Sequence, residues 1–119
     1  MLRIFALFVG IGLMVLGLCG FFSYLAPHGK LFALFRVNLE HNVLLLTTGL
    51  LGILCGLCSG FISKLYLFLV GCLYLFLAAL GFYTGDAMLL QMVAVNRPDN
   101  YLHLAVALLC LTAACALRR

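Results

Sequence analysis

Two groups of polar side chains stand next to long apolar runs, and their types could do chemistry. They combine amide, imidazole and carboxylate groups, and they are Asn38, His41, Asn42, Asn96, Asp99, Asn100 and His103. Asp99 and His103 are spaced i,i+4, which places both on one face of a helix. An imidazole beside a carboxylate can form an ion pair, carry a proton or hold a small ligand. We expect an ion-pair or capping role, and the alternative is a proton or small-ligand site.

The asparagines that open the two groups are placed to cap helices. Asn38 and Asn96 each precede an apolar run, where a side-chain oxygen can accept a bond from a free backbone N–H group. Asn96 and Asp99 have the spacing of a capping box, and Pro98 falls in the first turn, where its missing N–H does no harm. We therefore predict that helices begin at both asparagines.

Metal, haem and thiol chemistry have weaker support in the sequence. A haem held by two histidines needs both inside the bundle, and His103 is the only histidine that we expect to lie deep. Cys55 and Cys58 form a C-x-x-C pair, a spacing that can bind zinc or exchange disulfides. All six cysteines lie in apolar runs, where a thiol acts as a small hydrophobe: Cys19, Cys55, Cys58, Cys72, Cys110 and Cys115. We predict no metal, no cofactor and no catalytic residue.

The composition decides where these side chains must be held. Of the 119 residues, 67% are hydrophobic and 8% are charged, with a mean hydropathy of +1.29. A soluble domain is about 45–50% apolar and about 25% charged, so a soluble domain, a disordered tail and a secreted disulfide scaffold are excluded. The net charge of +4 comes from single basic residues at the ends of apolar runs. This distribution is typical of membrane anchoring and not of nucleic-acid binding.

The chain holds four apolar runs, each near the length of roughly 20 residues that a spanning helix needs. Backbone polar groups must be paired inside a bilayer, so we predict an all-α membrane four-helix bundle that forms one domain, 1–119. The expected helices cover about 2–25, 39–59, 63–85 and 98–117. The segments 31–35 and 88–93 are apolar but too short to span. We expect short amphipathic pieces that lie at the interface or between helices, or apolar loops that lie on lipid.

The charges favour one orientation. Arg3, Lys64, Arg118 and Arg119 fall on one side without any acidic residue, which favours both termini in the cytoplasm. The first run resembles a signal peptide, but Pro27 follows the only small-residue cleavage site. We expect an uncleaved first helix.

The sequence repeats itself. A shift of 58 places Asn38 on Asn96 and Asn42 on Asn100, and a shift of 61 places Arg3 on Lys64. The chain therefore reads as two hairpins, 1–60 and 61–119, related by a pseudo-two-fold axis along the membrane normal. Asn42 and Asn100, each one turn into its helix, should then be hydrogen-bond partners near this axis. Small-xxx-small spacing predicts close helix packing at Gly52, Gly56, Gly81 and Gly85.

The motifs at the heads of the second and fourth runs resemble a known family. These are Val37-Asn38-Leu-Glu-His-Asn42 and Val95-Asn96-Arg-Pro-Asp-Asn100-Tyr-Leu-His103. They are similar to those of the small bacterial four-helix membrane proteins catalogued as domain of unknown function 4383. Members often have a histidine where this chain has Leu45, so a paired-histidine role for His103 is in doubt. The resemblance implies a four-span bundle in the bacterial inner membrane and assigns no activity.

These observations favour a non-enzymatic membrane protein with a structural, accessory or partner-binding role. The expected partners are the lipid bilayer and a second copy or another membrane protein, and not nucleic acid. The first alternative is a small transporter or channel, although no carboxylate lies in the middle of an apolar run. The second alternative is a redox protein that uses a haem or the thiols.

Overall fold

The structure is a computed structural model that describes residues 1–22, 30–31, 35–36, 38–84, 87–89 and 93–117. It contains four long helices, as the sequence predicts: α1 (Leu2–Gly20), α2 (Leu39–Cys58), α3 (Gly60–Thr84) and α4 (Arg97–Ala116). Each is long and apolar enough to cross a membrane. The molecule is 42 Å along its longest axis, comparable to a bilayer with its headgroups, about 40–45 Å.

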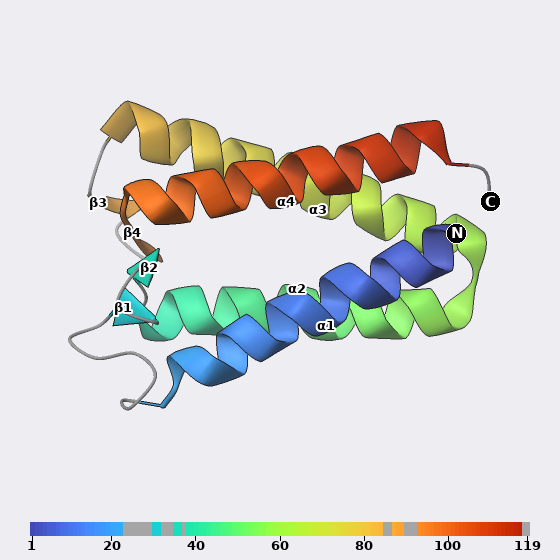
Figure 1. Cartoon of the computed structure of the whole chain (residues 1–119), viewed down its shortest axis with the longest axis horizontal. Coiled ribbons are helices and arrows are strands. Elements are labelled where there is room, and N and C mark those ends of the chain that lie inside the picture. The colour runs from blue at the N-terminus through green and yellow to red at the C-terminus, as the bar shows by residue number, and fades with distance from the viewer. Residues whose placement is uncertain (23–29, 32–34, 37, 85–86, 90–92, 118–119) are drawn as a thin grey trace.

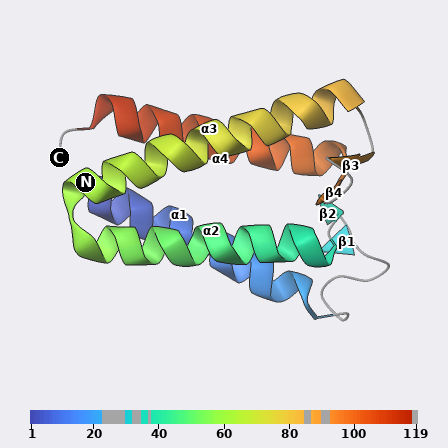
Figure 2. The same cartoon turned by 180° about the vertical axis from the view of Figure 1, so that it is seen from behind.

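The helix bounds follow the apolar runs with one difference. The first helix ends at Gly20 instead of continuing to about residue 25, and Phe21 closes it with a backbone bond to Leu18. The second and third helices are separated by Ser59 alone, which has an extended backbone. The Ser59 hydroxyl accepts a bond from the Ile62 N–H at 3.2 Å, so this one residue also satisfies a free donor of the following helix. Figure 2 shows α2 passing directly into α3.

Two short β-hairpins occupy the segments for which we expected interfacial pieces or loops. Strands β1 (Lys30–Leu31) and β2 (Phe35–Arg36) pair antiparallel, and so do β3 (Ala87–Leu89) and β4 (Val93–Val95). Strands were not expected in these segments. Strands form here because a segment too short to cross the membrane must still pair its backbone polar groups. A two-stranded ladder does this locally.

All four strands lie at one end of the bundle, and the N-terminus and the end of α4 lie at the other (Figure 1). The strands also connect the two halves of the chain. β2 contacts α4, β4 contacts α2, and β2 contacts β4. Each hairpin of strands is therefore packed against a helix from the opposite half.

The helices pack most closely within two pairs, α1 with α2 and α3 with α4. Glycines make the first pair tight. A Cβ atom added to Gly10 would lie 2.6 Å from the Gly49 carbonyl oxygen, and one added to Gly56 would lie 2.7 Å from the Leu7 side chain. Gly52, predicted with Gly56 to lie at a helix contact, faces both Gly10 and the Tyr66 hydroxyl. Of the other predicted glycines, Gly81 packs against α4, while position 85 lies outside the described residues.

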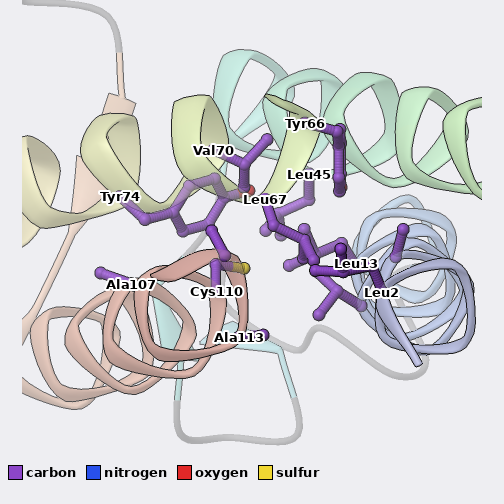
Figure 3. Close-up of a cluster of buried hydrophobic side chains, with 13 residues drawn as sticks. Leu2, Leu13, Leu45, Tyr66, Leu67, Val70, Tyr74, Ala107, Cys110 and Ala113 are labelled. Carbon is purple, nitrogen blue, oxygen red and sulfur yellow. The ribbon is translucent and has the colours of Figure 1, made fainter. Parts of the chain in front are cut away.

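A buried hydrophobic core joins the two pairs (Figure 3). It draws on all four helices, and its labelled members are Leu2, Leu13, Leu45, Tyr66, Leu67, Val70, Tyr74, Ala107, Cys110 and Ala113. The outward surfaces carry many exposed large apolar side chains, such as Phe8, which is 70% exposed. So much apolar surface is unfavourable in water and favourable in lipid.

Candidate functional site

The predicted polar residues begin with two helix caps. The Asn38 side chain accepts a bond from the His41 N–H at 2.9 Å. The Asn96 side chain accepts from the Asp99 N–H at 3.1 Å, and the Asp99 carboxylate accepts from the Asn96 N–H at 3.0 Å. This reciprocal pair is a capping box, so the capping predictions are confirmed.

The next turn of each helix is buried. His41, Asp99 and His103 are each 0% exposed, while Asn42 and Asn100 are 4% and 2% exposed. We expected only His103 among the histidines to lie deep, but His41 is equally buried. Glu40 is exposed. His41 is the next residue on the helix, so its side chain is rotated by roughly 100° from that of Glu40 and faces the interior.

The two histidines meet across the interface between the helix pairs. The Nε2 atoms of His41 on α2 and His103 on α4 are 3.2 Å apart, and their ring centroids are 5.2 Å apart at an interplanar angle of 61°. Two neutral imidazoles form one bond at this distance when one ring donates from Nε2 and the other accepts. The inference that Leu45 deprives His103 of a partner was therefore wrong. The partner of His103 is His41, which lies one helical turn before Leu45 on α2.

The two inner asparagines do not bind each other. Within the described structure, neither the Asn42 nor the Asn100 side-chain oxygen has a hydrogen-bond partner, so a bond between the two amides is excluded. Each oxygen instead faces a glycine of the preceding helix, Gly20 for Asn42 and Gly81 for Asn100. A Cβ atom at either glycine would overlap the oxygen. The prediction of a mutual pair was wrong because a glycine notch within the same hairpin receives each amide.

A further set of interior polar contacts involves a threonine and two tyrosines within the apolar runs, which were not among the predicted site residues. The Thr48 hydroxyl donates to the Leu44 carbonyl at 2.8 Å and lies 2.8 Å from the Tyr74 hydroxyl, which therefore donates to it. The Tyr66 hydroxyl donates to the Thr48 carbonyl at 2.6 Å. Both tyrosines belong to α3, so Thr48 fastens α3 to α2.

The ring of Tyr74 also contacts the histidine pair. Its centroid is 5.4 Å from that of His103, with the rings at 89°. Because the rings meet edge to face, this contact adds packing to the hydrogen bond of the pair. The available signal in the sequence was a tyrosine within an apolar run, since a buried hydroxyl needs a partner.

Basic side chains bind helix ends at the opposite end of the molecule. The Arg3 guanidinium donates to the carbonyls of Gly56 and Leu57 at 2.8 and 3.0 Å, and the Lys64 ammonium donates to the Ala114 carbonyl. These carbonyls lie in the last turns of α2 and α4, where backbone acceptors lack helical partners and a cation is favourable.

The thiols differ in their exposure in the part of the chain that the structure describes. All six cysteines are free; Cys110 is buried in the core, while Cys58, Cys72 and Cys115 are exposed. Among the described residues, no three histidine, cysteine, aspartate or glutamate side chains are grouped so that they could hold a metal ion.

Comparison with known proteins yields one match. The family model described as "Domain of unknown function (DUF4383)" matches residues 3–116. No curated protein and no solved structure matches the chain.

Proposed function

We propose, from the premise that this chain belongs to the DUF4383 family, that it is a small multi-pass protein of the bacterial inner membrane with a structural, accessory or partner-binding role. Its four apolar helices support membrane insertion. The observation that carries the proposed role is that interior polar groups make contacts between helices and cap helix ends. His41 contacts His103, Tyr74 contacts Thr48, and Asp99 holds a capping box. These contacts join and cap helices, and so we infer no catalytic residue, metal or cofactor.

The proposed architecture is a pair of repeats related by a pseudo-two-fold axis along the membrane normal. Its support is a set of equivalent contacts that recur in the registers of 58 and 61 residues. Arg3 binds the Gly56 carbonyl as Lys64 binds that of Ala114. Gly20 faces Asn42 as Gly81 faces Asn100. The exchanged contacts of β2 with α4 and of β4 with α2 fit the same axis.

The proposed orientation places both termini in the cytoplasm. Arg3 and Lys64 lie at the end of the bundle where α1 begins, and Glu40 and Asp99 lie in the first turns of α2 and α4, at the end with the strands. Basic residues next to membrane spans favour the cytoplasmic side.

The second candidate function is a small channel or transporter. The observation that favours it is the interior series of polar side chains, which runs from the histidine pair through Tyr74 and Thr48 to Tyr66. A haem protein is less compatible with the histidine geometry. Imidazole nitrogens bind metals at about 2 Å, so two ligands on opposite sides of one ion lie about 4 Å apart, and the observed Nε2 separation is 3.2 Å.

Absorption and flux measurements on the purified protein, together with photocrosslinking in native membranes, separate these candidates. An accessory protein should show no visible absorption band and no proton or metal-ion flux in proteoliposomes above protein-free controls. A photoreactive residue at the exposed position Phe76 should form one discrete adduct with a single membrane protein or second copy in native membranes. Flux that is lost in a Thr48→Val, Tyr74→Phe variant would instead establish the channel or transporter.

A further inference from the structure

A groove opens on the outer surface between α3 and α4, at the end of the molecule that carries Arg3 and Lys64. Its volume is about 490 Å³, and it is lined by Phe61, Lys64, Leu65, Phe68, Ala114 and Cys115. The phenylalanines and Leu65 are roughly half exposed, so the walls of the groove face the surroundings of the bundle and not its core. Of the described residues that line the groove, only Lys64 is charged, so the groove combines apolar walls with one ammonium group.

The ammonium group of Lys64 is held in place by one hydrogen bond and keeps further N–H donors. It donates to the Ala114 carbonyl, which fixes it between the two helices. An ammonium group has three N–H donors, so one bond to a carbonyl leaves donors for a further anionic group. Among the described residues, no acidic side chain lies at this end of the bundle, where Arg3 adds a second positive charge.

We propose that this groove binds one anionic phospholipid, with the phosphate at Lys64 and an acyl chain along Leu65 and Phe68. The proposal rests on the membrane placement given above and deepens it by naming a lipid class and a position. Charge complementarity carries it, because basic pockets between spanning helices on the cytoplasmic side bind anionic headgroups. A second cavity of about 400 Å³, along α1, offers an internal comparison, since its lining residues are apolar and uncharged.

Thermal unfolding of the full chain in detergent tests the proposal. Phosphatidylglycerol should raise the melting temperature more than phosphatidylcholine with the same acyl chains. Lys64→Gln should weaken the apparent affinity for phosphatidylglycerol about fivefold, the share of roughly one basic residue near an anionic lipid surface. Cys115→Trp, which fills the groove from an exposed lining position, should reduce the response to both lipids.

Arg3→Gln is the matched control. Arg3 makes the equivalent bond to a helix end in the first hairpin but does not line this groove. It should lower the melting temperature and leave the preference for phosphatidylglycerol intact. An equal loss of preference in the two variants would attribute the effect to general charge and overturn the site.

Three other outcomes also overturn it. Stabilisation by inorganic phosphate equal to that by phosphatidylglycerol would mean a free-anion site, and a Lys64→Gln chain that keeps the wild-type preference would remove the assigned residue. A change from dimer to monomer in Cys115→Trp without any lipid response would assign the groove to a second copy.

If the variants unfold, native mass spectrometry of the wild-type chain decides, because equal retention of both lipids contradicts the proposal. None of these results depends on the flux and absorption measurements that test the proposed function.

Discussion

Single residues control how closely the helices approach. Gly20 and Gly81 have no side chain, and the oxygens of Asn42 and Asn100 occupy the space where a Cβ atom would be. These oxygens have no conventional hydrogen-bond partner in the described structure, and the glycine Cα–H groups that face them can form weak C–H···O bonds. A glycine and an asparagine together thus fill one notch between two helices.

We predict that Gly81→Ala lowers the free energy of unfolding by about 1–3 kcal/mol, the usual cost of overpacking a well-packed contact. The added methyl group must displace the Asn100 side chain, which is 2% exposed. Gly12→Ala is the control because nothing lies within 4 Å of a Cβ atom built there. Thermal unfolding in detergent measures both; equal melting temperatures for the two variants would contradict the notch.

The histidine pair gives a second prediction at this scale. His103→Leu removes the group that faces the Nε2 atom of His41, and it should destabilise the bundle by about 0.6–2 kcal/mol, the range for interhelical polar contacts in membranes. His103→Gln, which keeps a polar group near the Nε2 position, should cost less. Combining His103→Leu with His41→Leu should cost less than the sum of the single changes, and strict additivity would show that the two rings do not interact.

At the scale of the elements, α2 and α4 each begin and end with a specific side-chain contact. Asn38 and Asn96 close the first turns of α2 and α4, and Arg3 and Lys64 bind their last turns. The donors and acceptors that a helix leaves free at its ends are costly in a low-dielectric environment. The ends of α2 and α4 are therefore completed by side chains from within the chain.

Arg3→Met should loosen the end of α2 more than its middle. The loss of two bonds from a cation to terminal carbonyls should cost about 0.5–2 kcal/mol. Amide hydrogen exchange in the last turn of α2 should become faster, while exchange around Asn42 stays unchanged. Uniform acceleration along α2 would argue that Arg3 stabilises the whole bundle instead of one helix end.

The sequence predicts the elements of this chain better than it predicts their contacts. Long apolar runs and the capping residues Asn38 and Asn96 are local signals, and the helices follow them. The contact of His41 with His103 joins residues 62 positions apart, and no local spacing encodes it. Tyr74 was overlooked because a tyrosine counts as apolar in hydropathy, although its hydroxyl binds Thr48. The strands were missed because their pairing is set by backbone groups rather than by side-chain type.

At the scale of the whole molecule, two hairpins are joined at Ser59 and meet through the core, the histidine pair and the strands. With two helices in each hairpin, the proposed membrane insertion gives both hairpins the same orientation. The end of the bundle that carries Arg3 and Lys64 also carries the N-terminus and the junction of α2 with α3 (Figure 2).

We therefore predict cytoplasmic signals from topology reporters fused after Lys64 and after the C-terminal residue, since basic residues flanking spans stay inside. A reporter between β1 and β2 should give the opposite signal. Opposite signals from the first two fusions would disprove four spans, and a periplasmic signal from both would reverse the orientation.

The separation of the two histidines along the chain has a consequence for synthesis. The ribosome adds 62 residues between His41 and His103, which takes roughly 3–12 s at about 5–20 residues per second. During this interval α1 and α2 can already close on each other through their glycines, because their contacts lie within the finished half. The contact of the His41 imidazole with His103 can form only once α4 has been made. We therefore expect the packing contacts within the first hairpin to form before its polar contact with α4.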